Sequence, residues 1–385
     1  MEWVKLGDIA EITMGQSPDS SYYNENGEGL PFFQGVSDFG EVFPSPSKFT
    51  TKPKKIAQKG DILIGVRAPV GDINISNEDC CIGRGIASIR PNNKNYSRDF
   101  LYFHLLSQNK YLNSQATGST FKAISRSVLE NILVPKFTSG AQENITYTIA
   151  STRNLIAKRR EQIDGLDALV SSVFYDMFQP YLEDKEKTIK LSDITSHISS
   201  GSTPRGGKEV YTSDGILFIR SQDVLMNRLD YSEVAYIPLE IHKTMKRSTL
   251  HYKDVLINIT GASIGRTAVF YGETGSANTN QHVASIRLKG NVITPEFLSY
   301  YFSTEYFQKV IQKVSSGGTR EALNYQQIGE FRIPEAPISK QEMFVRIKSR
   351  IEAQKESLRA SLLELETLFD ALMQEAFSGH LNQSY

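Results

Sequence analysis

Short apolar runs occur twice along the chain, in the same order. The runs ILIGV (62–66) and VLINI (255–259) are rich in β-branched residues, and turn-forming residues flank them, which predicts short buried strands. IASIR (86–90) and VASIR (283–287) follow them and predict further strands. Glycine-rich segments between the strands indicate loops. Two helices are expected as well, over 100–112 and 297–310. Each stretch is therefore predicted to be mixed α/β.

A different pattern follows each stretch. Glycine and proline almost vanish over 142–178 and 340–377, and apolar residues recur at gaps of seven, three and four. This spacing is a heptad seam, which buries one helix face against another helix. The predicted seam residues are Ile156, Ile163, Leu166 and Val170 in the first helix and Leu358, Leu362, Leu365 and Phe369 in the second.

The alternative for these segments is an amphipathic helix packed only on its own domain. The stripe is narrow and long, which favours pairing of the two helices with each other. We expect an antiparallel two-helix coiled coil that separates two globular domains, with pseudo-two-fold symmetry.

Further matches extend the repeat beyond the strands. VKLGDIAEI (4–12) matches IKLSDITSHI (189–198), and a Gly-x-x-Pro string follows each. GLPFFQG (29–35) matches GILFIRS (215–221), RDFLYFHLL matches PEFLSYYFS, and GSTFKAISRSVLENILVP matches GGTREALNYQQIGEFRIP. So many matches in one order indicate internal duplication. The predicted parts are a first globular domain (1–140), a central helix (141–180), a second globular domain (181–338) and a C-terminal helix (339–385).

Composition limits the class of protein. Of 385 residues, 39% are hydrophobic and 22% are charged, which is typical of a globular protein, and no apolar run approaches the ~18 residues of a membrane span. The beginning of the sequence lacks the pattern of a signal peptide. Cys80 and Cys81 are adjacent, without CxxC spacing, and we expect a buried structural pair. We therefore expect a cytoplasmic protein.

Catalytic motifs are scarce in the sequence. GASIGRT (261–267) lacks the lysine and the spacing of a phosphate-binding loop, and no GxGxxG string opens a helix. The six histidines form no HxxxH or HExxH pair. We expect a non-catalytic chain with no cofactor or metal of its own.

Binding is what remains, and long double-stranded DNA is an obvious candidate for the ligand. Two copies of a domain on a spacer suit a long ligand with two separated sites. Basic clusters occupy the same place in both copies, and their phosphate-contact candidates are Lys52, Lys54, Lys55, Lys243, Lys246 and Arg247. The alternative is a solvated charged face. The net charge of zero argues against indiscriminate coating of nucleic acid.

The whole pattern resembles the specificity (S) subunits of type I restriction–modification systems. The strings that carry the resemblance are KLGDI and KLSDI, GDILI and KDVLI before a glycine-rich loop, and GST or GGT before a helix that ends in VP or IP. AQENI and SKQEM start the long helices, and FYDMF and EAFSGHL close them. The N-terminal lead is brief, only Met1–Trp3, so the C-terminal helix must complete the symmetry.

The resemblance implies a division of labour. Each globular domain would be a target-recognition domain that reads one half of a bipartite, asymmetric DNA sequence. The helices would set the distance between the halves and dock two modification subunits, which hold the methyl donor and methylate adenine. Restriction subunits would join them to translocate and cut DNA.

Loop positions at which the copies differ are candidates for reading bases. Arg and Gln can each make paired hydrogen bonds to a base edge. The candidates are Gln34, Ser37, Asp38, Arg67, Asp72, Arg84 and Lys122 in the first copy, and Arg220, Gln222, Asp223, Thr260, Arg266 and Gln281 in the second. The alternative for each residue is a polar group that faces water.

Three other functions stay open at this point. The chain could be an enzyme, such as a fused methyltransferase or nuclease. It could also be the specificity part of a related fused restriction–methylation enzyme, or a scaffold that binds only proteins.

Overall fold

The computed structural model describes residues 2–92, 95–117, 122–204, 206–316 and 321–378. It divides the chain into two compact units. The first unit is Met1–Ile163 with Leu358–Tyr385, and the second unit is Asp164–Ser357. Both units are mixed α/β, as the sequence predicts.

The first unit is built on a four-stranded antiparallel sheet in the order β2-β10-β7-β8. Its strands are Ala10–Met14, Ile86–Pro91, Ile62–Gly65 and Ile73–Ile75. A two-stranded pair joins β1 (Trp3–Lys5) to β11 (Leu133–Pro135). A second sheet in the order β3-β5-β4-β9-β6 comprises Tyr23–Asn24, Phe49–Thr50, Leu30–Phe33, Cys80–Ile82 and Ile56–Ala57.

The second unit repeats this plan. Its four-stranded antiparallel sheet has the order β13-β21-β18-β19 and comprises Thr195–Ser200, Val283–Leu288, Val255–Asn258 and Thr267–Val269. β12 (Thr188–Lys190) pairs with β22 (Arg332–Pro334) as β1 pairs with β11. A parallel pair recurs too: β14 (Ile216–Ile219) with β20 (Ala277–Thr279) corresponds to β4 with β9. The expected strands around ILIGV, VLINI, IASIR and VASIR are confirmed.

The second unit also has elements that the repeat did not predict. β17 (Ala235–Ile237) extends the β14–β20 pair, and β15 (Val224–Leu225) forms a short hairpin with β16 (Arg228–Leu229). Helix α6 spans Leu239–Thr244. These elements lie between the matching strings, where the two copies differ in length.

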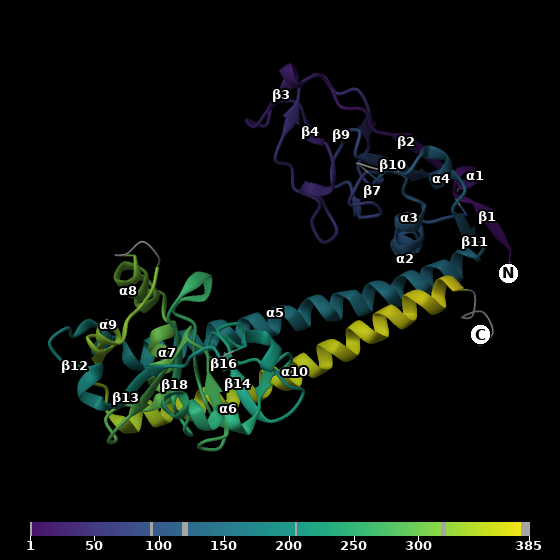
Figure 1. Cartoon of the computed structure of the whole chain (residues 1–385). Helices are drawn as coiled ribbons and strands as arrows, with labels where there is room; N and C mark the ends of the chain where they lie inside the picture. Colours follow the sequence, from purple (N-terminus) through teal and green to yellow (C-terminus); the bar gives the residue numbers. More distant parts are fainter. Residues whose placement is uncertain (1, 93–94, 118–121, 205, 317–320, 379–385) are drawn as a thin grey trace. The chain divides into compact units, whose positions relative to one another are not determined.

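Each predicted short helix is in fact two helices. The first region holds α2 (Arg98–Ser107) and α3 (Asn109–Gln115), and the second holds α7 (Pro295–Ser303) and α8 (Glu305–Ser315). Thr304 causes the second break because it is extended and its hydroxyl accepts the backbone N–H of Phe307, which caps α8. In the first region the polar residue Gln108 leaves the helical conformation. Within the second unit, α7 packs on β18 and β19, and Figure 1 shows α7 beside β18.

A second correction concerns the VP and IP strings. The sequence predicts that they end helices, but Val134–Pro135 and Ile333–Pro334 belong to β11 and β22. The preceding helices, α4 (Arg126–Glu130) and α9 (Tyr325–Gly329), are short and end earlier. The GST and GGT strings, 118–120 and 317–319, lie outside the described residues.

The two long helices predicted by the heptad pattern are present. α5 spans Ser139–Glu183 and α10 spans Ile338–Ser378. Ile156 and Val170 are buried, and the other six predicted seam residues are half-buried. Leucines off the seam are exposed: Leu155, Leu169, Leu363 and Leu368. The apolar stripe therefore faces protein, and its flanks face water.

Each unit contains parts of both long helices. In the first unit the core includes Ile149 from α5 together with Met373, Ala376 and Phe377 from α10. In the second unit Phe174 and Phe178 of α5 pack with Phe344 and Ile351 of α10. Each core therefore joins the beginning of one long helix to the end of the other.

A buried glutamine fastens the start of each long helix to its own unit. Gln142 is 2% exposed, accepts the backbone N–H of Ser97 at 3.1 Å and donates to the carbonyls of Asn95 and Phe137. Gln341 is fully buried and makes the same set of bonds with Thr294, Val292 and Ala336. These glutamines are the Q of AQENI and SKQEM, so the matching strings have a matching structural cause.

The two cysteines meet the expectation of a buried pair. Cys80 and Cys81 are free thiols on β9, both fully buried. Burial raises the pKa of Cys80 to about 11, which keeps the thiol protonated and unreactive.

Candidate nucleic-acid interface

Loops of the first unit meet at one end of the strands of its four-stranded sheet, where β2 and β7 end and β10 begins. We call residues 15–18, 34–38, 66–72, 83–85 and 122–124 the first loop edge. Backbone hydrogen bonds join its parts: Gly85 donates to Gln34 at 3.0 Å, Val66 to Gly85 at 2.8 Å and Ala68 to Lys122 at 3.0 Å. These bonds bring the backbones at Gln34, Arg67, Arg84 and Lys122 together.

The second unit has the equivalent surface. We call residues 201–204, 219–223, 259–266, 280–282 and 321–323 the second loop edge. Asn280 donates its backbone N–H to Ile219 at 3.1 Å, Ile259 donates to His282 at 2.9 Å, and Leu323 donates to Ile259 at 2.9 Å. An isolated bridge between Thr260 and Ala322 matches one between Arg67 and Ala123. The three bonds match those from Gly83 to Phe33 (2.8 Å), from Val66 to Gly85 (2.8 Å) and from Ile124 to Val66 (3.0 Å) in the first unit, so the two edges share these backbone contacts.

The Gly-x-x-Pro strings explain how these loops can lie so close. A Cβ atom on Gly201 would fall 1.6 Å from the carbonyl oxygen of Thr279, and one on Gly15 would fall 2.2 Å from that of Gly83. Only glycine allows such an approach between backbones. The repeated glycine thus allows the end of β2 or β13 to lie directly against the segment that precedes β10 or β21.

Most base-reading candidates reach water from these edges. Gln34, Ser37, Arg67, Asp72, Arg84 and Lys122 are exposed in the first loop edge, and Gln222 and Gln281 in the second. Thr260 and Arg266 are half-buried. Asp38 is also half-buried, and its carboxylate accepts the hydroxyl of Ser47 at 2.6 Å.

Arg220 and Asp223 form an ion pair within the second loop edge. The Arg220 guanidinium donates to both carboxylate oxygens of Asp223, at 2.9 and 3.0 Å, and also to the carbonyl of Glu233. The Asp223 side chain is 5% exposed and accepts the backbone N–H of Arg220 as well. This pair closes the turn after β14, so its geometry favours a role in holding the loop over direct contact with a base.

The basic clusters lie next to the loop edges. Lys54 and Lys55 are exposed, and the Lys55 carbonyl accepts the N–H of Ile82, two residues before Arg84. Lys246 and Arg247 are exposed in a short 3-10 turn, and the Arg247 carbonyl accepts the hydroxyl of Ser199 at 2.9 Å. Lys54 and Lys55 therefore lie near the first loop edge, and Lys246 and Arg247 lie beside β13, the strand that leads into the second loop edge.

The other two phosphate candidates have partners within the protein. Lys52 donates to the hydroxyl of Tyr22 at 3.0 Å and lies 4.3 Å from the centre of its ring. Lys243 forms an ion pair with Glu240 at 2.9 Å on α6.

Sequence reasoning missed a polar groove beside the second loop edge. Its volume is about 540 Å³, and it is lined by Gly261, Ala262, Ile264, Lys309, Gln312, Lys313, Ser316 and Glu321. Lys309 and Lys313 are four residues apart, so they share one face of α8. That spacing in the sequence was the available signal.

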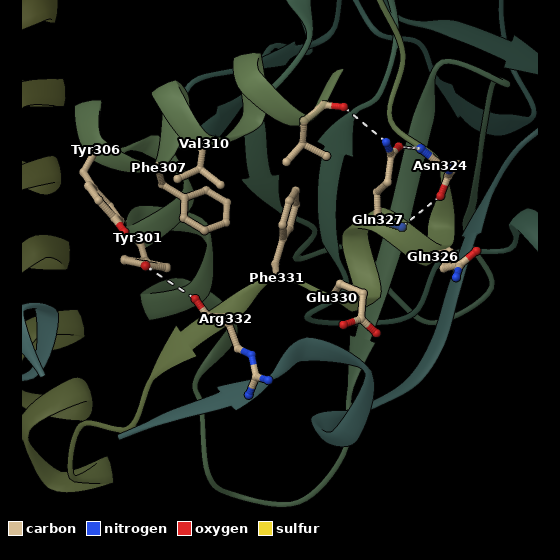
Figure 2. A pocket seen from close by; sticks show the side chains of 11 residues that line it. Tyr301, Tyr306, Phe307, Val310, Asn324, Gln326, Gln327, Glu330, Phe331 and Arg332 are labelled. Atoms are coloured by element: carbon tan, nitrogen blue, oxygen red, sulfur yellow. Dashed lines mark hydrogen bonds between the residues drawn. The ribbon is translucent and has the colours of Figure 1, made fainter. Parts of the chain in front are cut away.

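A second hollow in the same unit is apolar. Figure 2 shows the side chains that line it. The pocket has a volume of about 480 Å³ and is lined by Tyr301, Tyr306, Phe307, Val310, Val314, Asn324, Gln326, Gln327, Glu330, Phe331 and Arg332. Asn324 and Gln327 cap α9 by exchanging hydrogen bonds of 2.8 and 2.9 Å. None of the residues predicted to contact DNA lines this pocket.

The described part of the chain contains no group of three His, Cys, Asp or Glu side chains placed to hold a metal ion. No helix in that part has the length and apolar character that crossing a membrane requires.

Comparison with known families gives the duplicated fold an identity. The model of the type I restriction modification DNA specificity domain matches residues 1–164 and again residues 183–367. The chain belongs to this family. It is a type I DNA-specificity subunit, a non-catalytic class of subunit. The resemblance inferred from the repeated strings is confirmed.

Two relatives illustrate the range of similarity. The MjaX specificity subunit of Methanocaldococcus jannaschii is 41% identical over 168 residues, which are 43% of this chain and 40% of that protein. The type I restriction enzyme EcoBI specificity subunit of Escherichia coli is 22% identical over 99% of this chain and 86% of its own length.

A solved structure shows the same fold. The S subunit of the type I restriction–modification system from M. genitalium aligns with a TM-score of 0.61 at 17% identity, covering 98% of this chain and 96% of that one.

Proposed function

We propose that each unit reads one half of a bipartite, asymmetric DNA sequence through its loop edge. The duplicated loop edge supports this most directly, because different side chains stand on the same backbone contacts in the two units. Arg67 in the first unit occupies the position that Thr260 occupies in the second, and Arg84 occupies the position equivalent to Gln281. A common scaffold with different polar groups would give two domains that bind DNA alike and prefer different bases.

Arg67 and Arg84 are the strongest base-reading candidates of the first unit. Both are exposed, and an arginine can donate two hydrogen bonds to O6 and N7 of guanine. Gln34, Ser37, Asp38, Asp72 and Lys122 complete the first set, and Gln222, Thr260, Arg266 and Gln281 form the second. Lys54, Lys55, Lys246 and Arg247 would hold phosphates, and Lys313 joins them from the groove on α8, where Lys309 is paired with Glu305 at 2.6 Å.

We propose further that α5 and α10 pair as an antiparallel coiled coil. In the first unit Arg160 forms an ion pair with Glu366 at 2.7 Å. In the second unit Lys355, which is 4% exposed, pairs with Asp167 and lies 3.3 Å from Glu352. Residue numbers rise along one helix as they fall along the other, which is the antiparallel order. A buried lysine within a helix seam also specifies its register, and the Lys355 ammonium reaches an exposed carboxylate of the other helix.

This pairing gives the helices two roles. The target-recognition domains would be residues 1–140 and 181–338. The helical segments 141–180 and 339–385 would set the distance between the two half-sites. They would also dock two modification subunits that methylate adenine, and restriction subunits would add ATP-dependent translocation and cleavage. We place this assembly in the cytoplasm.

Sequencing of DNA methylation tests the proposal directly. The chain would be expressed with its modification partner in cells that lack other type I systems. The expected result is methylated adenine in one asymmetric motif with two specified halves and a fixed unread spacer. A protein scaffold would give no motif, and a fused enzyme would methylate or cleave DNA without partners.

A further inference from the structure

A chain of hydrogen bonds crosses the second loop edge. The Thr203 hydroxyl donates to the side-chain oxygen of Gln281. The Gln281 side-chain nitrogen lies 2.9 Å from Nε2 of His282, and Nδ1 of His282 lies 2.5 Å from the Thr260 hydroxyl oxygen. Four side chains from three loops therefore share one network.

The network gives each group a defined role. An amide nitrogen can only donate, so Nε2 of His282 must accept from Gln281 and the ring proton lies on Nδ1. That N–H then donates to Thr260. The backbone supports the arrangement, because the His282 N–H donates to the side-chain oxygen of Asn280 at 3.1 Å and the His282 carbonyl accepts from Ile259.

This arrangement couples the orientation of the Gln281 amide to three neighbouring side chains. To turn the amide over, His282 would have to carry its proton on Nε2, and both threonine hydroxyls would have to reverse their roles. A solvent-exposed glutamine would otherwise adopt both orientations. The side chain of Gln281 is exposed, so an amide that two hydrogen bonds already hold in place is presented to a ligand, which reduces the rotational penalty at binding.

The chemistry of a fixed amide matches one base. Adenine shows an N6 donor beside an N7 acceptor in the major groove, and a glutamine amide offers the complementary acceptor and donor. Within this network the Gln281 oxygen keeps a second lone pair and its nitrogen keeps a second N–H. Guanine shows two acceptors there, which the amide oxygen would repel.

We propose that Gln281 reads an adenine in the half-site of the second unit, and that Thr203, His282 and Thr260 are positioning residues that orient its amide. This inference rests on the proposed function, because it requires that the second loop edge enter a major groove. The first unit differs at this place: Arg84 corresponds to Gln281 and Gly85 to His282, and the Ser17 hydroxyl accepts the backbone N–H of Arg84 at 3.3 Å.

The test is a selection of binding sites from a randomised duplex pool by the chain in complex with its modification partner. Four variants are compared with the wild type: Gln281→Ala, Thr203→Val, Thr203→Ser and Gln326→Ala. Gln326 is an exposed glutamine at the apolar pocket (Figure 2) and serves as the control. The wild-type site is then rebuilt with 7-deazaadenine, which lacks the N7 acceptor, at each adenine in turn.

The expected result is confined to one position. Gln281→Ala should lower the preference for adenine there by about 5- to 150-fold and leave the other half-site intact. 7-Deazaadenine at that position should weaken binding of the wild type but not of Gln281→Ala. Thr203→Val should reduce the preference, Thr203→Ser should keep it because the hydroxyl remains, and Gln326→Ala should have no effect.

Two failures are distinguishable. If the wild type selects no bipartite motif, the proposed function fails, and this inference fails with it. If the wild type selects a bipartite motif that Gln281→Ala leaves unchanged, only the inference is overturned. Equal loss of preference in Thr203→Val and Thr203→Ser would overturn the role of the network while leaving Gln281 as the reading residue.

Discussion

Asp254 accepts two hydrogen bonds from the guanidinium of Arg287, at 2.7 and 2.8 Å, and its carboxyl group is fully buried. Asp61 and Arg90 form the same pair in the first unit, at 2.6 and 2.8 Å. Each aspartate also accepts a backbone N–H three residues before it, from His251 and from Gln58. The pair joins the D of GDILI or KDVLI to the R of ASIR, so the strings that reveal the repeat are physically linked.

This pair predicts a local loss of stability. Asp254→Asn should lower the free energy of unfolding of the second unit by about 2–4 kcal/mol, because it removes charge from a buried two-bond pair and leaves Arg287 without its anion. Denaturant unfolding followed by hydrogen exchange in each unit measures it. The control is Asp214→Asn, at an exposed aspartate. Equal destabilisation of both units would contradict a local role for the pair.

Patterns in the sequence predicted the parts of the fold that depend on periodicity. The buried strands at 62–65 and 255–258 and the helix seam at Ile156 and Val170 follow from the spacing of apolar residues alone. The break between α7 and α8 was missed, because a threonine cap at position 304 interrupts an otherwise continuous apolar pattern. Capping is a local competition that periodicity does not report.

The loop edges could be located but not fully interpreted from sequence. Comparison of the copies pointed to the right loops, since the loops occupy equivalent places in the repeat. It could not distinguish Arg220, whose guanidinium is held by Asp223, from Arg84, whose side chain is exposed. It also gave no reason to single out His282, because a histidine's role here depends on neighbours from other loops.

A second prediction concerns the separation of the half-sites. Arg67→Ala and Arg84→Ala should relax base preference in one half-site only, by about 1–3 kcal/mol for each paired hydrogen-bond interaction with a base. The reason is that both side chains stand on the first loop edge. Binding-site selection with each variant measures the change. Relaxation of both halves together would refute the modular interpretation.

A third prediction concerns the basic clusters. Lys54→Gln with Lys55→Gln, or Lys246→Gln with Arg247→Gln, should weaken binding to every sequence and reduce the salt slope by about 0.9 for each phosphate that is no longer neutralised. Titrations at several salt concentrations measure both quantities. Lys52→Gln is a useful comparison, since Lys52 already donates to Tyr22. Unchanged affinity and slope would show that these residues are only solvated surface.

A fourth prediction concerns pH. Burial lowers the pKa of His104 from 6.5 to about 4, and its Nε2 donates to the Leu133 carbonyl at 2.9 Å. Between these pH values the unfolded chain binds a proton that the folded chain does not. Stability should therefore fall as pH drops from about 6.5 to about 4, by about 3 kcal/mol over the full window.

The equivalent position in the second unit provides the matched variant. Tyr301 is the residue of the second unit that is equivalent to His104, and its hydroxyl donates to the Arg332 carbonyl at 3.5 Å. His104→Tyr should remove this share of the pH dependence, whatever its effect on stability at pH 7. Unfolding measured at several pH values in both proteins gives the difference. Identical slopes between pH 6.5 and 4 would mean that His104 does not titrate as described.

The last prediction tests whether the long helices act as a ruler. One heptad inserted into α5 after Arg160 and another into α10 after Arg359 would both fall between the Arg160–Glu366 and Asp167–Lys355 pairs, so each pair is preserved. A heptad also keeps the apolar seam in phase and lengthens each helix by ~10.5 Å. That length corresponds to ~3 base pairs at ~3.4 Å each.

Rotation of the DNA groove makes the outcome sharper. Three base pairs turn the groove by roughly 100°, since one turn takes ~10.5 pairs. The second loop edge would then face the wrong side of a duplex lengthened by three pairs. We therefore expect either a longer selected spacer or a large loss of affinity, with the bases of both half-sites unchanged. Binding measured on duplexes with a graded series of spacers separates these outcomes. Tight binding to the original spacer would show that the helix length does not set the distance between half-sites.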